Sequence, residues 1–363
     1  MSEPRRKRLL ICGPVAFPGQ PAAGGFQSAN LRVGALAQSL GFEVDYLRYP
    51  DVKGGAATKL AAYARAFGRI LHALTFGLRA DIVHFTPLIR HFTAFEVVIT
   101  SIARARGMRV VVDLRAGNQA RVWQAGGGLY RALYRRLLKN GHVIAVESPQ
   151  YEALTREAAG RDALWLPNHV PDALVAAPRA APAAHRPPRL IYVGAQSEAK
   201  GVRHACAVLE ALQDPWPGTR LALAGHADAG FIDSLSPRAK PFIDVLGAVP
   251  FETLKGELDR ADVFMFLTHW EGEGHSNALT EAMARGCLAI VTRRGFNVEV
   301  VQEGGLVIDD RDCTDLIARR IADLWRDDGG LALSHAATAV VLRTFTATAA
   351  TARLKAIYEA ARG

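Results

Sequence analysis

The chain has 363 residues, half of them hydrophobic, and its Lys and Arg residues exceed Asp and Glu by nine. This length is too great for one ordinary core, so two domains of roughly 100–200 residues each are expected. The sequence contains no uncharged apolar run long enough to span a membrane, and its basic N-terminus leads into a strand-like stretch without the apolar core of a signal peptide. We therefore expect a cytoplasmic protein.

Strand-like and helix-like segments alternate through the first part of the chain, residues 1–170. The strand-like segments are short and apolar, and the helix-like ones carry apolar residues at helical spacing. The expected strands are residues 9–13, 43–47, 82–85, 109–112, 142–146 and 163–166, and the expected helices are residues 28–40, 59–78, 95–106 and 129–139. Alternation of this kind predicts an α/β domain with a parallel, doubly wound sheet.

Residues 171–188 are rich in Ala and Pro, have no helical or strand period, and are expected to connect two domains. A second alternating series fills residues 189–345. Its expected strands are residues 189–194, 220–224, 243–246 and 261–267, and its expected helices are residues 202–212, 251–260 and 313–327. A last helix is expected over residues 347–361, within a C-terminal segment 346–363 that could return to the first domain. Two such domains facing each other would bind ligands beyond the carboxyl ends of their strands.

The stretch from Thr268 to Thr292 joins a strand end, an acidic loop and a helix start. A loop that leads into a helix offers unpaired backbone N–H groups and the positive end of the helix dipole, which attract phosphate or carboxylate. The residues expected to hold such an anion are Gly274, His275, Ser276, Asn277, Ala278 and Leu279.

Two glutamates, Glu273 and Glu281, stand eight positions apart around this segment. Carboxylates repel phosphate, so both are better explained as acceptors for hydroxyl groups on other parts of a ligand. Phosphate together with hydroxyls suggests a sugar nucleotide. In the alternative interpretation, Glu281 only complements the helix dipole and Glu273 is a solvated loop charge.

The string that begins at Glu273, E-G-H-S-N-A-L-T-E-A-M-A, resembles the E-x7-E signature of retaining glycosyltransferases of the GT-B fold, in the large family four of glycosyl transferases group 1. A typical version in that family reads E-G-F-P-N-V-L-L-E-A-M-A. The resemblance implies two Rossmann-like domains that face each other across a cleft. It also implies that Glu273 contacts hydroxyls of the donor sugar, that Glu281 contacts the ribose, and that the backbone from Gly274 to Asn277 contacts sugar and phosphates.

The stretch V-G-A-Q-S-E-A-K-G, which ends at Gly201, resembles the family motif V-G-R-L-x-x-x-K-G, whose Arg and Lys hold the donor pyrophosphate. The resemblance assigns Lys200 to the pyrophosphate and Gly194 to the donor site, whereas Ala195 stands at the Arg position. One of two phosphate-binding cations is therefore missing, and each such charge can contribute a few kcal/mol of transition-state stabilisation. Either activity is reduced or another cation substitutes.

Gly24 and Gly25 precede the first expected helix and permit a ligand to approach the backbone closely. The pattern G-x-G-x-x-G is absent, so a dinucleotide fingerprint is not indicated, and a flexible surface loop is the alternative. In the family, the corresponding glycine pair lies beside the donor phosphates and the acceptor, which assigns Gly24 and Gly25 to the site.

Four residues of the first part are candidates for the cleft. Asp113 ends a strand where many family members place a His that contacts the donor sugar, so Asp113 could accept a proton from an acceptor hydroxyl and its neighbour Arg115 could meet a phosphate. Either residue could instead cap the next turn. His84, in D-I-V-H, and Asn168, in L-P-N-H-V-P, resemble the family's D-V-V-H and I-P-N-G-V-D. We expect His84 to line the cleft and Asn168 to position the hinge, although a lone strand-end His is more often structural.

A metal site is not indicated. The resemblance implies that cations and helix dipoles replace a divalent ion, and no Asp-x-Asp pair follows a strand, because Asp309 and Asp310 are adjacent. The four cysteines have neither CxxC nor Cys/His ligand spacing. We expect no metal and no cofactor, with a nucleoside diphosphate sugar, UDP- or GDP-linked, as co-substrate.

Basic and aromatic residues cluster over residues 63–72 and 130–139. On helices they would form cationic amphipathic surfaces suited to the inner face of an anionic membrane, so peripheral membrane contact is a secondary hypothesis. The commoner outcome is that the apolar faces pack on the sheet and the arginines are solvated. The positive charge also suits nucleic acid, but it is diffuse and no binding module is visible, so no nucleic-acid partner is expected.

The sequence therefore predicts a metal-independent, retaining glycosyltransferase. It would move a sugar from a nucleoside diphosphate sugar to a hydroxyl of a glycan or lipid-linked acceptor, in bacterial surface polysaccharide assembly. The alternative is a binding or scaffolding protein that kept the fold and lost turnover, which Ala195 and Asp113 favour.

Overall fold

The structure is a computed structural model that describes residues 7–20, 24–50, 52, 55–77, 79–181, 185–309, 313–328 and 330–363. The chain divides into two compact units: unit 1 comprises Met1–Asn168 and Ala347–Gly363, and unit 2 comprises His169–Thr346. Leu78, at the end of one expected helix, and Asp310 lie outside the described residues. Within those described ranges, no helix is both long and apolar enough to cross a membrane.

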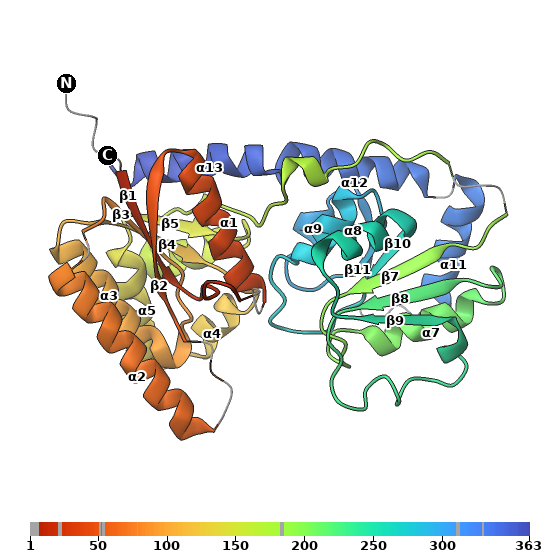
Figure 1. Cartoon of the computed structure of the whole chain (residues 1–363), viewed down its shortest axis with the longest axis horizontal. Helices are drawn as coiled ribbons and strands as arrows, with labels where there is room; N and C mark the ends of the chain where they lie inside the picture. Colours follow the sequence, from red (N-terminus) through yellow and green to blue (C-terminus); the bar gives the residue numbers. More distant parts are fainter. Residues whose placement is uncertain are drawn as a thin grey trace. The chain divides into compact units, whose positions relative to one another are not determined.

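Unit 1 is built on a six-stranded parallel sheet with the strand order β2-β1-β3-β4-β5-β6 (Figure 1). The strands are β1 (Lys7–Gly13), β2 (Phe42–Arg48), β3 (Ile82–Phe85), β4 (Arg109–Leu114), β5 (Val143–Val146) and β6 (Leu164–Trp165). The helices are α1 (Gly25–Ser39), α2 (Ala56–His72), η1 (Ala73–Gly77), η2 (Arg90–Phe92), α3 (Thr93–Ala105), α4 (Gln119–Ala125), α5 (Gly128–Asn140), α6 (Tyr151–Ala159) and α13 (Ala347–Ala360).

The central strands of unit 1 are apolar on both faces because a helix layer covers each face of a parallel sheet. The helices α1 and α13 pack against each other and against one face, while α2, α3 and α5 form a second group (Figure 1). Side chains of a strand alternate between faces, so Val111, which packs in the same core as α13, places Asp113 on that face too. The C-terminal helix therefore covers the face from which Asp113 projects.

Unit 2 is built on a second six-stranded parallel sheet, with the order β12-β11-β10-β7-β8-β9. Its strands are β7 (Arg189–Val193), β8 (Arg220–Ala224), β9 (Ile243–Gly247), β10 (Val263–Phe266), β11 (Leu288–Thr292) and β12 (Gly305–Ile308). Its helices are η3 (Asp172–Leu174), α7 (Val202–Leu212), η4 (Lys240–Phe242), α8 (Phe251–Arg260), α9 (Asn277–Ala284), α10 (Asn297–Val301), α11 (Thr314–Asp327) and α12 (Leu331–Thr344).

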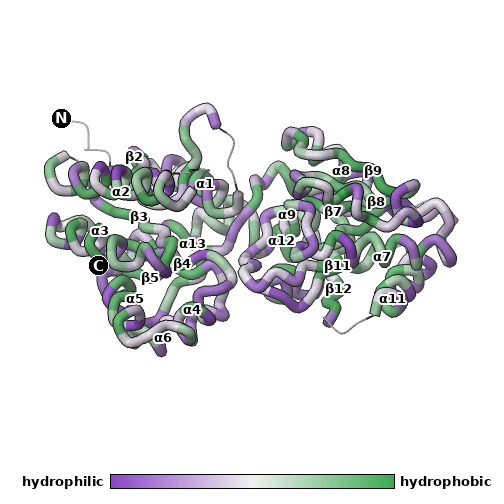
Figure 2. Tube along the Cα trace, turned by 90° about the horizontal axis from the view of Figure 1, so that it is seen from below, coloured by the Kyte–Doolittle hydropathy of each residue, from purple (hydrophilic) through white to green (hydrophobic). Residues whose placement is uncertain are grey.

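The strand order of unit 2 reverses beside β7. The chain runs from β7 through β8 to β9 at one edge and then crosses to β10 on the other side of β7. Here α7 packs with α11, and α9 packs with α12. Figure 2 shows the strand segments mainly in the hydrophobic colour, whereas the helices alternate between hydrophilic and hydrophobic residues, as an amphipathic layer does. The loops after β7 and β10 meet at the point where open α/β sheets bind ligands.

The expected α/β fold with two doubly wound parallel sheets is confirmed. Several elements differ from expectation. The strand expected over residues 163–166 is only the two-residue β6, and the helix expected over residues 59–78 ends its α-helical part at His72 and continues as the π-helical turn η1. The strands β11 and β12 and the helices α4, α6, α10 and α12 are present in addition to the expected ones.

The Ala- and Pro-rich segment packs on unit 2 through its arginines. Arg179 donates from Nε to the carbonyl oxygen of Arg285 and from Nη2 to that of Leu258, both at 2.8 Å, and from Nη1 to that of Ala261. Arg186 makes a bidentate pair with Asp262, at 2.6 and 2.7 Å. The division between the compact units accordingly falls before this segment, between Asn168 and His169.

Candidate active site

Two loops of unit 2 meet at the reversal of strand order, residues 194–201 after β7 and residues 267–276 after β10. The backbone N–H of His269 donates to the carbonyl oxygen of Ala199 at 2.9 Å. Gly201 has a φ of +73°, and a Cβ at this position would lie 1.8 Å from the carbonyl oxygen of Leu267. Only glycine therefore allows the first loop to approach the end of β10 this closely.

This approach brings Lys200 and Glu273 together. Lys200 Nζ lies 2.9 Å from Glu273 Oε2, which also accepts a hydrogen bond from Thr268 Oγ1 at 2.9 Å. The Lys200 side chain is 25% exposed and that of Glu273 only 10% exposed. Lys200 also lies over the ring of Trp270, 5.9 Å from its centroid. A buried carboxylate from one loop and a partly exposed ammonium group from the other thus form an ion pair where the two loops meet.

The loop after β11 fixes the backbone of Glu273. Gly295 has a φ of +52°, and a Cβ there would lie 2.2 Å from the carbonyl oxygen of Glu273. The N–H of Glu273 donates to the carbonyl oxygen of Trp270 at 3.2 Å. Three successive loops of the sheet, after β7, β10 and β11, therefore hold this one carboxylate.

Helix α9 begins at Asn277, directly beyond the acidic loop. Ser276 is its N-cap and accepts a hydrogen bond from the N–H of Leu279 at 3.3 Å, as serine does at a helix start. His275 Nε2 lies 2.7 Å from Thr280 Oγ1, and its ring meets Phe345 edge-on at 5.0 Å. Gly274 and Ala278 flank this turn, and the N-terminus of the helix favours a negatively charged group.

Glu281 lies in the second turn of α9 and is 7% exposed. Its position on the same short helix as the N-cap keeps it within one helical turn of the first backbone N–H groups. The structure thus brings Lys200 and Glu273 together in unit 2, and it places the segment from Gly274 to Leu279 and Glu281 on the loop and helix that follow Glu273.

The turn after β7 is fixed by two glycines and a tyrosine. A Cβ on Gly225 would lie 2.0 Å from the carbonyl oxygen of Gly194, and both residues have positive φ. Tyr192 donates from its hydroxyl to the carbonyl oxygen of Ala195 at 2.8 Å. Burial, and then the nearby Glu273 carboxylate, raise the pKa of Tyr192, so the phenol stays protonated. The side chain of Ala195 is exposed and supplies no cation.

A buried polar network occupies the corresponding edge of unit 1. His84 Nε2 lies 3.0 Å from Asp113 Oδ2, and Arg115 donates from Nε to the same oxygen at 2.7 Å. Arg115 also donates from Nη1 to Asn168 Oδ1 at 2.6 Å. The hydroxyl of Tyr358, on α13, lies 3.2 Å from His84 Nδ1. The structure therefore joins His84, Asp113, Arg115 and Asn168 in one cluster, with Asp113 and His84 fully buried.

Charges in this network balance. Burial alone raises the pKa of Asp113, but the Arg115 guanidinium and the hydrogen bond from His84 outweigh it and hold the pKa below its usual range. The two ring nitrogens of His84 lie within hydrogen-bond distance of Asp113 Oδ2 and of the Tyr358 hydroxyl, so the imidazole links the carboxylate to α13. Asp113 Oδ1 is also buried and has no hydrogen-bond partner within the described parts of the chain.

Gly24 and Gly25 lie at the start of α1, as N-cap and first helical residue. Gly24 has a φ of +139°, in which a side chain would be strained, and no described atom lies within 4 Å of a Cβ built on either glycine. The backbone at this helix start is consequently open to a ligand.

Several residues that shape these sites were not expected from the sequence. Thr268 and Gly295 support Glu273, and Tyr358 completes the network of unit 1. Glu147 holds the loop after β4 by accepting from the N–H of Ala116 at 3.1 Å, where Ala116 has a φ of +75°. In the described ranges, no three His, Cys, Asp or Glu side chains come close enough to hold a metal ion.

Comparisons with known proteins agree on a fold and a domain. Residues 187–327 match the family model described as glycosyl transferases group 1. No curated protein matches the chain by sequence. The chain is similar over nearly its whole length to several solved structures, at identities that show the fold alone.

Sucrose-phosphate synthase from Thermosynechococcus elongatus superposes with a TM-score of 0.72 at 18% identity, covering 98% of each chain. Anabaena Alr3699/HepE in complex with UDP superposes with a TM-score of 0.72 at 14% identity, covering 97% of this chain and 99% of that one. WaaG, a glycosyltransferase involved in lipopolysaccharide biosynthesis, gives a TM-score of 0.65 at 15% identity, covering 96% and 99%. The chain therefore has the GT-B fold, and its residues 187–327 match the glycosyl transferases group 1 model.

Proposed function

We propose that this protein is a glycosyltransferase that moves a sugar from a nucleoside diphosphate sugar to a hydroxyl acceptor, with retention at the anomeric carbon. The observation that carries the proposal is the Lys200–Glu273 pair, at 2.9 Å, where the strand order of the group 1 domain reverses. The Anabaena neighbour has been solved with UDP and with UDP-glucose, which favours a UDP-sugar over a GDP-sugar as the donor here.

Each residue has a role in this proposal that follows from its charge and position. Lys200 has three N–H donors, and one is directed at Glu273, so two can meet oxygens of the pyrophosphate. The N-terminus of α9 adds backbone N–H groups for the remaining phosphate charge. An ionised carboxylate accepts hydrogen bonds and cannot donate them. Glu273 and Glu281 therefore bind ligand groups that donate, namely the hydroxyls of the donor sugar and of the ribose.

Lys200 also serves the chemical step. When the bond between the sugar and the diphosphate breaks, negative charge grows on the leaving phosphate, and a preorganised cation stabilises that charge more than the ground state. With Ala195 in place of a second cation, we infer that Lys200 and α9 provide most of this stabilisation. Gly24 and Gly25 would admit phosphate or acceptor near the start of α1.

Asp113 and its partners are buried, so in this proposal they act by positioning. The network of Asp113, His84 and Arg115 fixes the carboxyl end of β4, and Arg115 anchors Asn168 at the end of unit 1. A proton-accepting role for Asp113 would require that its buried carboxylate reach an acceptor hydroxyl, which Asp113→Asn in a turnover assay tests.

Donor binding is tested by thermal unfolding with UDP, GDP, ADP and dTDP. At a ligand concentration of 100 times Kd the folded protein gains about 2.7 kcal/mol. We expect a shift with UDP that Lys200→Ala and Glu281→Ala diminish and that Lys240→Ala, an exposed lysine of the same unit, retains. No shift with any nucleotide would overturn the proposal.

Turnover separates an enzyme from a nucleotide-binding scaffold. UDP-glucose incubated with the protein and a hydroxyl acceptor should release UDP, and NMR of the product should show the anomeric configuration of the donor. Binding of UDP-glucose without transfer to any acceptor would favour the scaffold. The presence of Ala195 in place of a phosphate-binding cation is consistent with that alternative.

The proposed chemistry needs no metal. Lys200 and the α9 N-terminus supply the positive charge that a divalent ion would otherwise supply. EDTA should therefore leave UDP binding and turnover unchanged, and a loss restored by Mg²⁺ or Mn²⁺ would contradict this part of the proposal.

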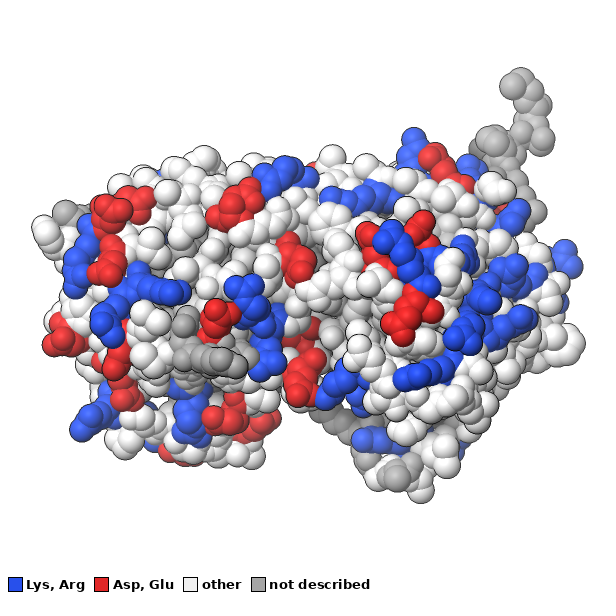
Figure 3. Space-filling view, turned by 180° about the vertical axis from the view of Figure 1, so that it is seen from behind, with Lys and Arg blue, Asp and Glu red and all other residues white. Residues whose placement is uncertain are grey.

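We also propose peripheral contact between unit 1 and an anionic membrane that carries a lipid-linked acceptor. Figure 3 shows Lys and Arg side chains gathered on the unit 1 side of the view (right). The apolar face of α2 is used in the core, where Phe67 stacks on Phe95 at 4.9 Å, but Leu129 at the start of basic α5 is 78% exposed. Flotation with anionic vesicles should be stronger than with neutral ones and should weaken in Arg136→Glu, with Arg238→Glu in unit 2 as control.

A further inference from the structure

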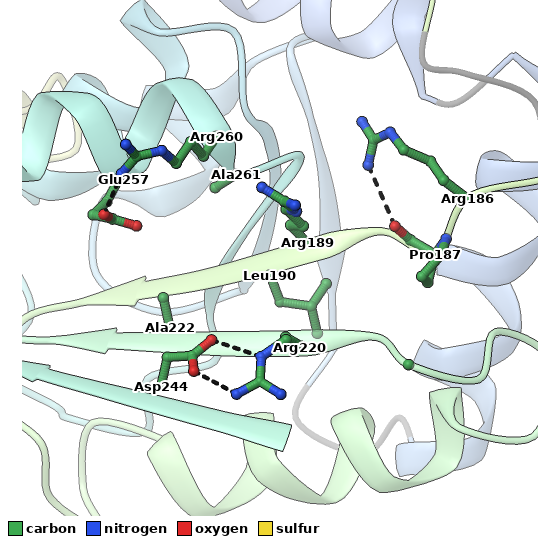
Figure 4. A pocket seen from close by; sticks show the side chains of 11 residues that line it. Arg186, Pro187, Arg189, Leu190, Arg220, Ala222, Asp244, Glu257, Arg260 and Ala261 are labelled. Carbon is green, nitrogen blue, oxygen red and sulfur yellow. Dashed lines mark hydrogen bonds and ion pairs between the residues drawn. The ribbon is translucent and has the colours of Figure 1, made fainter. Parts of the chain in front are cut away.

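A pocket of unit 2 lies at the amino ends of its strands, away from the loops described above (Figure 4). It has a volume of about 400 Å³ and takes lining residues from β7, β8, β9 and the last turn of α8. The strand β7 runs from Arg189 in this pocket to the turn before Lys200, so the two sites are separated by five strand residues, roughly 16 Å.

The pocket is lined by arginines, without a lysine. Arg186, Arg189, Arg220 and Arg260 line it together with two carboxylates, Asp244 and Glu257. The apolar part of the lining comes from Pro187, Leu190, Ala222 and Ala261. Guanidinium groups bind carboxylate or phosphate through two parallel hydrogen bonds, and they are the cations preferred where an anion is recognised by shape.

Each carboxylate at this pocket already has an arginine partner. Arg220 Nε lies 2.9 Å from Asp244 Oδ2, and its Nη2 donates to the other oxygen. Arg260 Nη1 lies 2.6 Å from Glu257 Oε1. Asp262, just behind the lining, takes the bidentate pair with Arg186, as described above. Three of the four arginines are thus neutralised by the protein itself.

Arg189 is the exception. Its backbone N–H donates to Asp262 Oδ2 at 2.8 Å, which fixes the position of its backbone. Its guanidinium makes no hydrogen bond or ion pair within the described parts of the chain. Figure 4 shows this side chain between those of Arg186 and Arg260, with no interaction drawn to it. Together with Arg220, the charge of Arg189 nevertheless influences the pKa of the pocket carboxylate Asp244. The hydrogen bond from Arg220 comes first among the causes that lower the pKa of Asp244, and Arg189 contributes as well.

Trp325 holds the arginine on one side of Arg189. The Arg186 guanidinium lies over the ring of Trp325, 5.0 Å from its centroid, and Trp325 Nε1 donates to the Arg186 carbonyl oxygen at 2.7 Å. On the other side, Arg260 keeps its Nε and Nη2 without partners in the described ranges. The whole of one guanidinium and part of a second therefore remain available, beside an apolar floor.

We propose that this pocket is a second ligand site, for an organic phosphate whose phosphate group binds Arg189 and Arg260 and whose apolar body rests on Leu190 and Ala222. Arg189 has five N–H donors and Arg260 keeps three more on Nε and Nη2, so three phosphate oxygens can accept more of these hydrogen bonds than the two oxygens of a carboxylate can. The surplus positive charge of Arg189 is balanced by that ligand. The site is independent of the donor site, because it shares no residue with it.

The test uses phenyl phosphate as probe and measures binding to the full chain by calorimetry. The two comparison ligands are inorganic phosphate, which lacks the ring, and benzoate, which carries a carboxylate in place of the phosphate. We expect phenyl phosphate to bind more tightly than either comparison ligand. Its affinity should fall at least tenfold in Arg189→Ala and be lost in Arg189→Glu. The matched variant Arg238→Ala, which removes an exposed arginine elsewhere in unit 2, should bind as the wild type does.

Lys200→Ala distinguishes this site from the proposed donor site. Phenyl phosphate binding should survive in Lys200→Ala, and UDP binding should survive in Arg189→Ala. The proposal is overturned if the wild type does not bind phenyl phosphate, if Arg189→Ala binds it unchanged, if Lys200→Ala abolishes it, or if benzoate binds equally well. Failure of UDP to bind anywhere would overturn the proposed function and leave this test intact.

Discussion

Replacing Gly201 by Ala tests whether the close packing of the loops after β7 and β10 sets the position of Lys200. A Cβ at Gly201 would lie 1.8 Å from the carbonyl oxygen and 2.4 Å from the carbonyl carbon of Leu267, and the residue has a φ of +73°. An alanine in the left-handed region costs about 1–2 kcal/mol. Relieving the overpacked contact costs about another 1–3 kcal/mol. The expected loss of stability is therefore about 2–5 kcal/mol.

Gly256→Ala is the matched control in the same unit. Gly256 lies inside α8, and no described atom lies within 4 Å of its Cβ position, so alanine should add about 0.8–1 kcal/mol by helix propensity. For a unit of this size, 1 kcal/mol shifts Tm by about 2–4 °C. We expect Tm to fall by about 4–20 °C in Gly201→Ala and to rise by about 2–4 °C in Gly256→Ala.

The same variants report on function. Because Lys200 is the neighbour of Gly201, a displaced loop moves the ammonium group away from Glu273, and UDP affinity should fall in Gly201→Ala but not in Gly256→Ala. The assay is thermal unfolding with and without UDP. A Gly201→Ala protein with the Tm and UDP affinity of the wild type would refute the view that loop packing positions Lys200.

The remaining predictions concern buried charges and the segment after unit 1. Burial raises the pKa of Glu96 to about 8 against the opposing hydrogen bonds from the Leu88 and Ile89 N–H groups, so the folded state keeps a proton that the unfolded chain loses. Stability should then fall as pH rises from about 4 to about 8, and Glu96→Gln should flatten this fall in urea unfolding measured across that range. Asp113→Asn should cost about 1–3 kcal/mol at neutral pH, because it removes the carboxylate that lies 2.7 Å from the buried Arg115 guanidinium and leaves it the more distant carboxylate of Glu147, at 4.0 Å. An unfolding midpoint equal to that of the wild type would contradict the network. Since the pKa of Asp113 is held low, the stability that its carboxylate provides is present at neutral pH and lost in acid, so the difference between wild type and Asp113→Asn should shrink as pH falls. Arg179→Ala removes three hydrogen bonds to backbone carbonyls and should make the segment around it a site of rapid limited proteolysis, whereas protection equal to the wild type would show that these bonds do not hold it.

The sequence predicted the sheet of unit 1, four of the six strands of unit 2 and the acidic loop, because each depends on local patterns. Alternating apolar strands and helical periods indicate a parallel sheet, and the order of charged and small residues after β10 indicates a loop before a helix. The helix α12 was not predicted, since its Thr, Val, Ser and His residues weaken helix propensity. It packs against α9 and β11, and its buried face contains Ser and Thr as well as Ala and Val, so the sequence shows no clear apolar stripe.

The partners of the site residues depend on contacts that no local pattern contains. Glu273 and Lys200 are 73 positions apart, and they meet because β7 and β10 are neighbours in the sheet. Tyr358 and His84 are 274 positions apart and meet only because α13 belongs to unit 1. Local sequence could indicate which residues are chemically suited to a site, but their hydrogen-bond partners are set by strand order and by the path of the chain between units.

The return of the chain to unit 1 also sets the order in which the protein can be completed during synthesis. The core of unit 1 includes Ala350, Leu354 and Ile357 of α13, which are made only after the 178 residues of unit 2, His169–Thr346. At about 5–20 residues per second, the ribosome needs about 10–35 s to make that stretch. For this time the apolar face of β1, β3 and β4 has α1 against it but lacks α13, the second helix of that layer. The half that is translated first is therefore the half that finishes folding last, and in the nascent chain its partly exposed sheet is a natural substrate for chaperones.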